Sequence, residues 1–312
     1  MPKPKIFQNI LAATDLVGTS DSPVLGAIQV AKHNGAGLHI IHVLESVYSG
    51  KDRRFVKHFK TGEEIVCNTV YEQTVREQIF GTYAAALKTL IHFEIIVTPG
   101  FPWEEILRWT RKERVDLVVL GPHTRRAEEK GVVRTDGTVG STVQGVISHE
   151  RCPVMIVNQM IPKEKLQFNE IVASTDFSQP CEYACRFAIR LAERLGSKLF
   201  LFHLVPKADL GKDSLSEYQT EATQKLKELC RNASAGIECE FGVHQGDSIY
   251  LGLLKYAAEK DADLIIMGSH TKEKDGRWYL GSAVESTSMR SPIPVVVVTN
   301  PRALKKIGSI SS

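Results

Sequence analysis

Long hydrophobic runs and paired cysteines are both missing from this sequence of 312 residues. No segment approaches the roughly 18 consecutive apolar residues that a membrane-spanning helix needs, and the apolar run near the N-terminus stops at Asp15, too early for a secretory signal. None of the six cysteines stands in a C-x-x-C pair, which favours reduced thiols over a disulfide framework and provides no zinc spacing. The sequence therefore predicts a cytoplasmic protein without a membrane span or a structural metal.

Strong net charge and recognisable catalytic motifs are also lacking. A formal charge of +3 for this length argues against general binding to nucleic acid or to a membrane surface. No Gly-Lys-Ser/Thr follows a glycine at the spacing of a P-loop, and no combination of nucleophile, base and orienting group is evident. We therefore predict no catalytic residues.

One stretch near the C-terminus has the features of a phosphate-binding turn. An apolar run at 264–267 ends on Gly268, a loop at 272–280 carries three cationic side chains, and Gly281 and Ser282 open a helical pattern. Backbone N–H groups at a helix N-terminus have no intrahelical partner, and the helix dipole favours negative charge there. The stretch predicts a buried strand that leads through a cationic loop to an anion-binding helix start.

The same order of motifs occurs twice in the chain, which indicates a tandem duplication. Residues 9–15 (NILAATD) return at 170–176 (EIVASTD), and 116–121 (DLVVLG) return at 263–268 (DLIIMG). The Gly140-Ser141 pair likewise has its counterpart in Gly281-Ser282. We expect a first domain at 1–158, a linker at 159–167, a second domain at 168–300 and a C-terminal tail at 301–312.

Apolar strand patterns alternate with helical patterns in each copy. The first copy predicts strands at 9–14, 38–44, 93–97, 116–120 and 154–157, and helices at 23–34, 63–92, 102–112 and 141–149. The second predicts strands at 170–175, 198–204, 237–243, 264–267 and 295–299, and helices at 180–195, 213–233, 248–259 and 282–289. Near-continuous apolar strands separated by helices are typical of a parallel sheet covered on both faces, so the fold class is α/β with two tandem doubly wound domains.

This succession of motifs resembles the universal stress protein family over both halves of the chain. The resemblance implies a five-stranded parallel sheet in the order 3-2-1-4-5 for each domain. It also implies that the pattern G-x2-G-x9-G-(S/T) binds ATP. ADP or AMP could take its place, and Mg²⁺ could accompany the nucleotide. In the family the last strands of two copies meet, so the resemblance implies that the two domains pair through the segments at 154–157 and 295–299, with a further homodimer as an option.

The resemblance assigns the cofactor-binding residues position by position. Asp15 and Asp176 would contact the adenosine end, although each could instead be a capping aspartate for the helix that follows. Val43 and Leu204 would line the adenine pocket. Phosphate would be held by Gly121, Gly140, Ser141 and Thr142 in the first domain and by Gly268, Gly281, Ser282 and Ala283 in the second. His270 could also meet a phosphate; a loop histidine with no ligand is the alternative.

Two departures from the family pattern affect this site. Thr124 and Thr271 stand where the second glycine is expected. At a positive φ a β-branched residue costs about 1–2 kcal/mol, whereas at a negative φ the hydroxyl adds a donor. The first copy also has a longer loop at 125–139, which could cover a nucleotide, fill the pocket or be solvated. The second domain is therefore the better predicted site.

Three hypotheses for the function remain open from the sequence. The leading one is a stress-response regulator that binds an adenine nucleotide and acts through conformation, with unknown protein partners. The second is an interaction or scaffold protein whose degenerate sites no longer bind nucleotide. The third is a weak ATPase, whose turnover would depend on Asp176 or Gly281.

Overall fold

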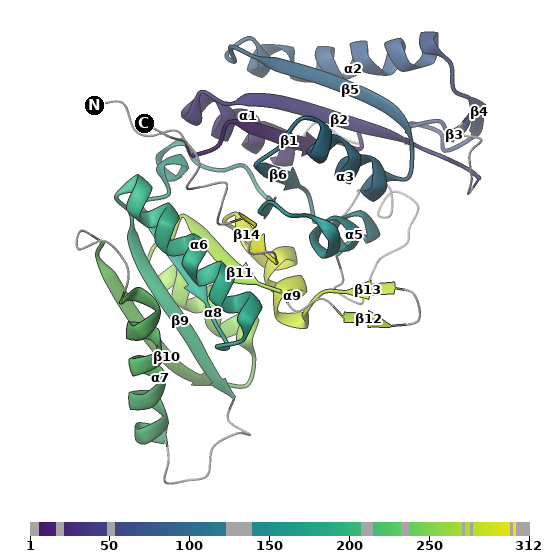
Figure 1. Cartoon of the computed structure of the whole chain (residues 1–312). Helices are drawn as coiled ribbons and strands as arrows, with labels where there is room; N and C mark the ends of the chain where they lie inside the picture. The colour runs from purple at the N-terminus through teal and green to yellow at the C-terminus, as the bar shows by residue number, and fades with distance from the viewer. Residues whose placement is uncertain are drawn as a thin grey trace.

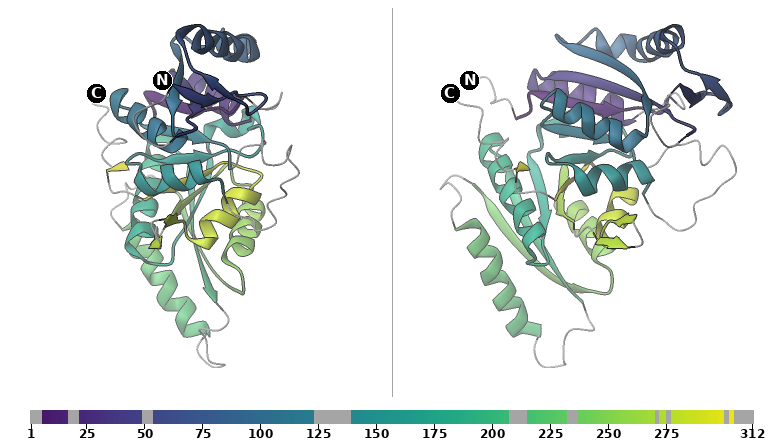
Figure 2. Two further views of the ribbon diagram at one scale, coloured as in Figure 1. Left: turned by 90° about the vertical axis from the view of Figure 1, so that its right-hand side faces the viewer. Right: turned by 45° about the vertical axis from the view of Figure 1, so that its right-hand side comes forward.

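The computed structural model describes residues 6–16, 22–48, 54–122, 139–206, 215–231, 237–269, 272–274, 277–299 and 302–303. Their centre is one sheet of ten strands that runs through both halves of the chain. Figure 1 shows the first half, coloured purple to teal, above the second half, coloured from teal through green to yellow. The two further views in Figure 2 show helices on both faces of this sheet.

Each half of the sheet has the predicted strand order, and its strands are parallel. The first half has the order β5-β2-β1-β6-β7, with strands β1 (Asn9–Ala13), β2 (Gly37–Glu45), β5 (Phe93–Gly100), β6 (Leu117–Leu120) and β7 (Val154–Ile156). The second half has the order β10-β9-β8-β11-β14, with strands β8 (Glu170–Ser174), β9 (Lys198–Pro206), β10 (Cys239–Gly246), β11 (Leu264–Gly268) and β14 (Val295–Val298). Both halves read 3-2-1-4-5, which confirms the fold expected from the resemblance.

The last strands of the two halves pair with each other in antiparallel direction. Val296 lies opposite Met155 in the centre of this junction, and each is only 1% exposed. The apolar edge that each half would otherwise present to water is thereby covered by the other half. The outer edges of the combined sheet are β5 and β10.

Helices cover both faces of the sheet, as a doubly wound fold requires. One face carries α1 (Ser22–Asn34), α2 (Thr69–Leu87), α6 (Gln179–Leu195) and α7 (Leu215–Cys230). The opposite face carries α3 (Pro102–Lys112), α5 (Ser141–His149), α8 (Ile249–Glu259) and α9 (Ser282–Arg290). Within the described residues, no helix is long and apolar enough to cross a membrane.

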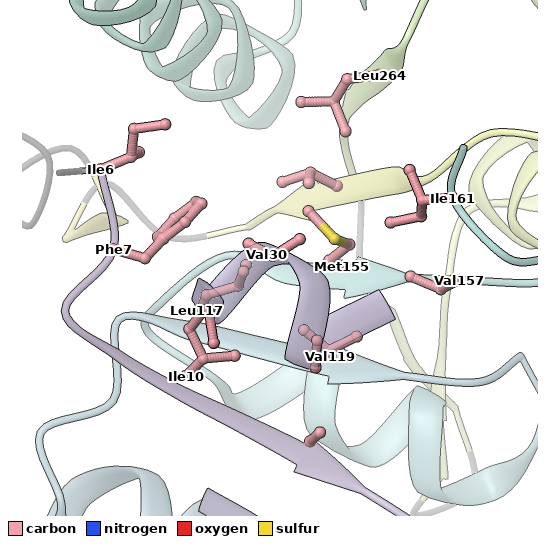
Figure 3. Packing of buried hydrophobic residues seen from close by; sticks show 14 of the residues in the cluster. Ile6, Phe7, Ile10, Val30, Leu117, Val119, Met155, Val157, Ile161 and Leu264 are labelled. Atoms are coloured by element: carbon pink, nitrogen blue, oxygen red, sulfur yellow. The ribbon is translucent and has the colours of Figure 1, made fainter. Parts of the chain in front are cut away.

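The core on the α1 and α6 face continues from one half into the other. Figure 3 shows Met155 of β7 close to Ile161 of the connecting segment, and Leu264 of β11 belongs to the same buried cluster. This segment forms a short 3-10 helix, η1 (Lys163–Gln167), that contacts α1. Lys165 within it donates to the carboxylates of Asp261 and Asp263 at 2.8 and 3.2 Å. The connection is thus packed into the molecule.

Two predictions of local structure are wrong. The helix expected at 63–92 begins only at Thr69, because residues before it form an antiparallel hairpin of β3 (Phe55–Lys57) and β4 (Glu64–Val66). The Asn68 side chain accepts a hydrogen bond from the Tyr71 N–H at 2.8 Å and so caps the helix where it begins. The loop expected at 272–280 also contains a hairpin, β12 (Lys272–Lys274) with β13 (Arg277–Tyr279).

Candidate functional site

Hydrogen bonds hold the turn after β1 at the carboxyl edge of the sheet. The Thr14 N–H donates to the Ile41 carbonyl at 2.9 Å, which continues the pairing of β1 with β2. The Leu16 N–H donates to the Thr14 hydroxyl at 3.1 Å, and the His42 Nδ1 donates to the Thr14 carbonyl at 2.8 Å. Asp15, the predicted adenosine contact, lies in the middle of this fixed turn.

The turn after β8 repeats this arrangement in the second domain. The Thr175 N–H donates to the Phe202 carbonyl at 2.9 Å, and the Phe177 N–H donates to the Thr175 hydroxyl at 2.9 Å. The His203 Nδ1 donates to the Thr175 carbonyl at 2.8 Å. His42 and His203 are both buried and hold the turns of the two domains in the same way.

His203 is held in one protonation state by its surroundings. Burial lowers its pKa below the ordinary value of 6.5, and the Thr175 carbonyl and Asp176 oppose this only in part. A neutral ring whose Nδ1–H donates to the carbonyl has an accepting Nε2, which meets the Tyr218 hydroxyl at 3.2 Å. Tyr218 therefore joins α7 to the turn that presents Asp176.

Both turns contain a residue in the left-handed region that is not glycine. Leu16 has a φ of 59° and Phe177 a φ of 63°. A side chain with a Cβ in this region costs on the order of 1–3 kcal/mol, so the surrounding hydrogen bonds must hold it there. In both domains the residue directly after the aspartate has this strained conformation, which indicates that the turn serves to orient the aspartate.

Asp176 itself is exposed and has a capping contact. Its Oδ1 accepts a hydrogen bond from the Ser178 N–H at 2.9 Å, just before α6 begins at Gln179. The capping alternative is thus realised for one of its two oxygens. An exposed carboxylate with a second oxygen can also accept hydrogen bonds from a ribose.

The helices α5 and α9 begin with glycine caps that lack a side-chain hydrogen bond. Gly140 has φ −62° and ψ 152°, and Gly281 has φ −60° and ψ 136°, so both have extended backbones of negative φ. A glycine cap has no side chain to satisfy the first N–H groups of its helix, which leaves them available to an anion. Ser141 and Ser282, the first helical residues, are exposed. This arrangement fits the predicted phosphate contacts.

Topology returns both helix starts to the carboxyl edge of the sheet. Each helix leads into a strand, β7 or β14, that runs parallel to β6 or β11, so each helix N-terminus lies at the end of the sheet where β6 and β11 finish. In the first domain the Gly140 N–H donates to the Pro122 carbonyl at 2.8 Å, directly after Gly121. The structure therefore brings Gly121, Gly140 and Ser141 together.

Gly268 has a packing role that the sequence did not reveal. A Cβ at this position would lie 2.5 Å from the Pro180 carbonyl oxygen and 2.6 Å from the Cys181 backbone nitrogen. These are backbone atoms at the start of α6, which cannot move aside as a flexible side chain could. The glycine lets α6 approach the end of β11, whether or not a phosphate binds beside it.

The hydroxyl group of Ser269, which directly follows Gly268, is buried without a hydrogen-bond partner among the described residues. A buried hydroxyl without a partner is unfavourable, so such groups commonly await a ligand or water. Pro122 occupies the position of Ser269 in the first domain and has no hydroxyl.

The two residues expected to line an adenine pocket differ in burial. Val43 is half-buried in β2, opposite Thr98 of β5. Leu204 is 7% exposed, and its side chain packs toward Gly252 of α8, where an added Cβ would clash with its Cδ1. The Leu204 side chain therefore mainly fills the core beneath the site. Thr142 and Ala283, the second residues of α5 and α9, are half-buried.

Three predicted site residues, Thr124, His270 and Thr271, lie outside the described residues. The effect of threonine at the expected glycine position therefore stays a prediction. The segment between Gly268 and Gly281 is described in part, and its strand β13 packs against α5 of the first domain. Gln144 of α5 also donates to the Glu285 carboxylate of α9 at 3.0 Å. The two candidate sites are thus connected across the junction.

A cluster of three polar side chains at the opposite edge of the sheet could not be found from the sequence. Ligand atoms of His39, Glu94 and Glu113 lie within 4.8 Å of one another and could hold a metal ion. They are close to a cavity of about 470 Å³ at the amino edge of the first domain, lined in part by His39, His92 and Glu94. The three residues come from β2, β5 and the end of α3, so no local spacing reveals them.

Comparisons with known proteins agree with this architecture. The model of the universal stress protein family matches residues 6–158 and 167–299. Universal stress protein MJ0577 of Methanocaldococcus jannaschii is 27% identical over 155 residues, covering 43% of this chain and 96% of the relative. Universal stress protein MJ0531 of the same organism is 27% identical over 160 residues, covering 47% of this chain and 91% of the relative.

One solved structure is similar over nearly the whole chain. It is a universal stress protein from Archaeoglobus fulgidus, with a TM-score of 0.62 and 19% identity. The similarity covers 93% of this chain and 98% of that one. At this identity the match shows the tandem fold, and the residues of the site must be argued on their own.

Proposed function

The chain belongs to the universal stress protein family, and from this premise we propose that it binds an adenine nucleotide at the carboxyl edge of the sheet, with the second domain as the better site. Asp176 would accept hydrogen bonds from the ribose, and the start of α9 at Gly281, Ser282 and Ala283 would hold the phosphates. The corresponding residues of the first domain are Asp15 and the start of α5. The bound species would be ATP, ADP or AMP, and Mg²⁺ would accompany a polyphosphate.

The observation that carries this proposal is the pairing of two prepared features at one edge. One is the strained turn of Asp176, fixed by Thr175 and His203. The other is the glycine-capped start of α9, whose first N–H groups lack a side-chain acceptor. The first feature suits the hydroxyl groups of a sugar and the second suits an anion, and a nucleotide has both.

Two differences favour the second domain. The Ser269 hydroxyl is buried without a partner among the described residues, whereas Pro122 at the matching position of the first domain has no hydroxyl. In the first domain the Gly140 N–H already donates to the Pro122 carbonyl. A ligand that bonds the Ser269 hydroxyl would satisfy a group that is otherwise unpaired, and this strengthens its binding.

The connection between the sites supports a regulatory role. The segment between Gly268 and Gly281 contacts α5 through β13, and Gln144 reaches Glu285. A nucleotide that binds between Gly268 and Gly281 would alter the contact of β13 with the first domain. We therefore propose that the protein signals its bound nucleotide through conformation to a protein partner, in the stress response that the family name describes.

A matched pair of variants tests the proposal in the full chain. Ser282→Glu places a carboxylate at the start of α9, where it stabilises the helix by about 0.3–1 kcal/mol but repels a phosphate. ATP affinity measured by titration calorimetry should fall by about tenfold or more. Ser141→Glu makes the same change at α5 and should lower affinity less than about threefold. Because both changes favour the free helix, lost affinity cannot be ascribed to unfolding.

A larger loss in Ser141→Glu would assign the better site to the first domain. Separately expressed halves are a poorer test, because each would expose the apolar edge that β7 and β14 cover. For the unaltered chain, ATP at a hundredfold excess over its dissociation constant should add about 2.7 kcal/mol to stability. A thermal unfolding scan detects this directly.

The alternative is an interaction protein without nucleotide. It is favoured by the structural roles that the motif residues already have: Gly268 is required by packing against Cys181, and Asp176 caps the turn before α6. In that case ATP, ADP and AMP would leave the unfolding midpoint unchanged. A weak ATPase would instead show turnover that disappears in an Asp176→Asn variant.

A further inference from the structure

Two cysteines of the second domain lie side by side. Cys230 is the last residue of α7, and Cys239 is the first residue of β10. Their sulfur atoms are 3.2 Å apart, both are free thiols, and both are partly exposed. Figure 1 and the right-hand view of Figure 2 show α7 lying along β10.

This pair lies at the outer edge of the second domain. β10 is an outer strand of the ten-stranded sheet, and α7 covers it. Only Ala222 and Leu226 are buried among the described residues of α7. Near the start of α7, Tyr218 contacts His203 at 3.2 Å, and Gln219 adds a long hydrogen bond of 3.5 Å to the Val243 carbonyl. A covalent link at Cys230 would therefore restrain the opposite end of the helix.

The two thiols are chemically unequal. Their sulfur atoms share one hydrogen bond in which either can be the donor, and this contact lowers the pKa of Cys239 and raises that of Cys230. Burial raises the pKa of Cys67 to about 12 and that of Cys181 to about 11. Cys185 is fully buried, which raises its pKa further still. Cys239 is thus the thiol best prepared to react with an oxidant.

We propose that Cys230 and Cys239 are a redox pair that closes into a disulfide on exposure to a hydroperoxide and fixes the end of α7 to the edge strand β10. This modification does not depend on the proposed nucleotide binding. It requires only the two adjacent thiols and a two-electron oxidant, for which hydrogen peroxide is the probe.

The reaction balances in two steps. Cys239 releases a proton, and its sulfur attacks one oxygen of the peroxide; the O–O bond breaks, and the departing hydroxide takes up a proton as water. Cys239 is now a sulfenic acid. Cys230 then releases its proton, and its sulfur attacks the sulfur of Cys239; the S–O bond breaks, and a second water leaves. Two thiols are oxidised and one peroxide is reduced to two waters.

The experiment treats the full chain with hydrogen peroxide, blocks the remaining thiols with an alkylating agent and maps the peptides by mass spectrometry. We expect the mass to fall by about two hydrogens, with one link between the peptides that contain Cys230 and Cys239. A thiol reductant should restore six free cysteines. Amide exchange in the last turns of α7 should slow by about tenfold or more in the oxidised form, because the link closes a short loop.

Single variants separate the two roles. Cys230→Ser should abolish the link and leave a sulfenic acid at Cys239 that a dimedone reagent traps. Cys239→Ser should abolish both the link and the trapped species. Cys67→Ser, which removes a thiol that bonds Glu72 instead of another cysteine, should leave the link intact.

Three outcomes would overturn the proposal. They are free thiols at both positions after peroxide treatment, a link that joins Cys230 to Cys185 instead, or a link between two chains. Should a serine variant fold poorly by circular dichroism, the peptide map of the unaltered chain still decides the question.

Discussion

The two domains have the same frame at their candidate sites but different surroundings. Both have a left-handed residue after the aspartate and a histidine that holds the preceding carbonyl. They differ beyond Gly121, which follows β6, and Gly268, which ends β11: the next residue is Pro122 in the first domain and Ser269, with a buried hydroxyl, in the second. The shared hydrogen bonds hold the carboxyl edge of the sheet in shape, and the residue after the glycine differs between the domains.

This difference shows which site features can vary without loss of the fold. The Thr-to-His hydrogen bond connects two neighbouring strands, so each domain needs it even without a ligand. The residue after the glycine, Pro122 or Ser269, differs between the domains although both sheets have the same strand order. The duplicated frame therefore allows one site to degenerate while the other keeps its chemistry.

The largest expected effect comes from separating the two domains at their junction. Val296→Asp places a charge opposite Met155, where both side chains are 1% exposed. The free energy of unfolding should fall by about 4 kcal/mol or more, because an unpaired carboxylate is buried there. Urea denaturation followed by circular dichroism measures this. Val70→Asp at a position that is 73% exposed is the control, and an equal loss in both variants would contradict the junction.

The second effect tests the close approach of α6 to β11. Gly268→Ala brings a methyl group within 2.5 Å of the Pro180 carbonyl oxygen, so unfolding should require about 1–3 kcal/mol less. Gly81→Ala in α2 has no neighbour within 4 Å and should stabilise by up to about 1 kcal/mol. Thermal unfolding compares the two variants. If Gly268→Ala leaves the stability unchanged, the glycine is needed for the ligand and not for packing.

The third effect concerns the hydrogen bond between the two domains. Gln144→Ala removes the donor to Glu285, and stability should fall by about 1 kcal/mol because the bond is partly buried and its acceptor is charged. Gln73→Ala removes a bond of 2.9 Å to Glu77 on an exposed helix face and should cost less than about 0.5 kcal/mol. Denaturation midpoints measure both; equal effects would mean that the bond adds nothing to the junction.

The smallest effect depends on pH. Burial lowers the pKa of His203 from its ordinary value of 6.5, so the unfolded chain takes up a proton there more readily than the folded one. The contribution of the neutral His203 ring to the free energy of unfolding is therefore complete above pH 6.5, and it is lost as the pH falls below the pKa of the unfolded chain. His203→Asn keeps a donor for the Thr175 carbonyl but cannot titrate. Its stability should fall less steeply than that of the unaltered chain from about pH 7.5 to about pH 5.5, and parallel curves would contradict this.

Much of the architecture could be predicted from the sequence because it depends on repeated local patterns. Apolar runs such as Leu264–Gly268 identify buried strands, and the repeated motifs indicate two equivalent domains. The start of α2 was predicted six residues too early, although Asn68 is a good capping residue and could have marked it. The hairpin of β12 and β13 could not be predicted, because a short polar segment has no apolar period to identify a strand.

The candidate site was only partly predictable. The aspartates and the glycine-serine pairs stand at recognisable places in the sequence, and the structure puts the described ones at the carboxyl edge. The packing role of Gly268 was invisible, because its neighbours in α6 are nearly ninety residues away in sequence. The positive φ of Phe177 was equally hidden, since no glycine or asparagine marks the position.

The sequence by itself determined the duplication, the parallel α/β class and the residues at the ends of the strands, because these follow from local periodicity and repetition. Tertiary structure alone decided which of those residues are needed for packing, which hydroxyls remain unpaired and which thiols meet. The reason is physical: a clash at Gly268, an unsatisfied Ser269 hydroxyl and the contact of Cys230 with Cys239 each depend on distances between elements that only the folded chain brings together.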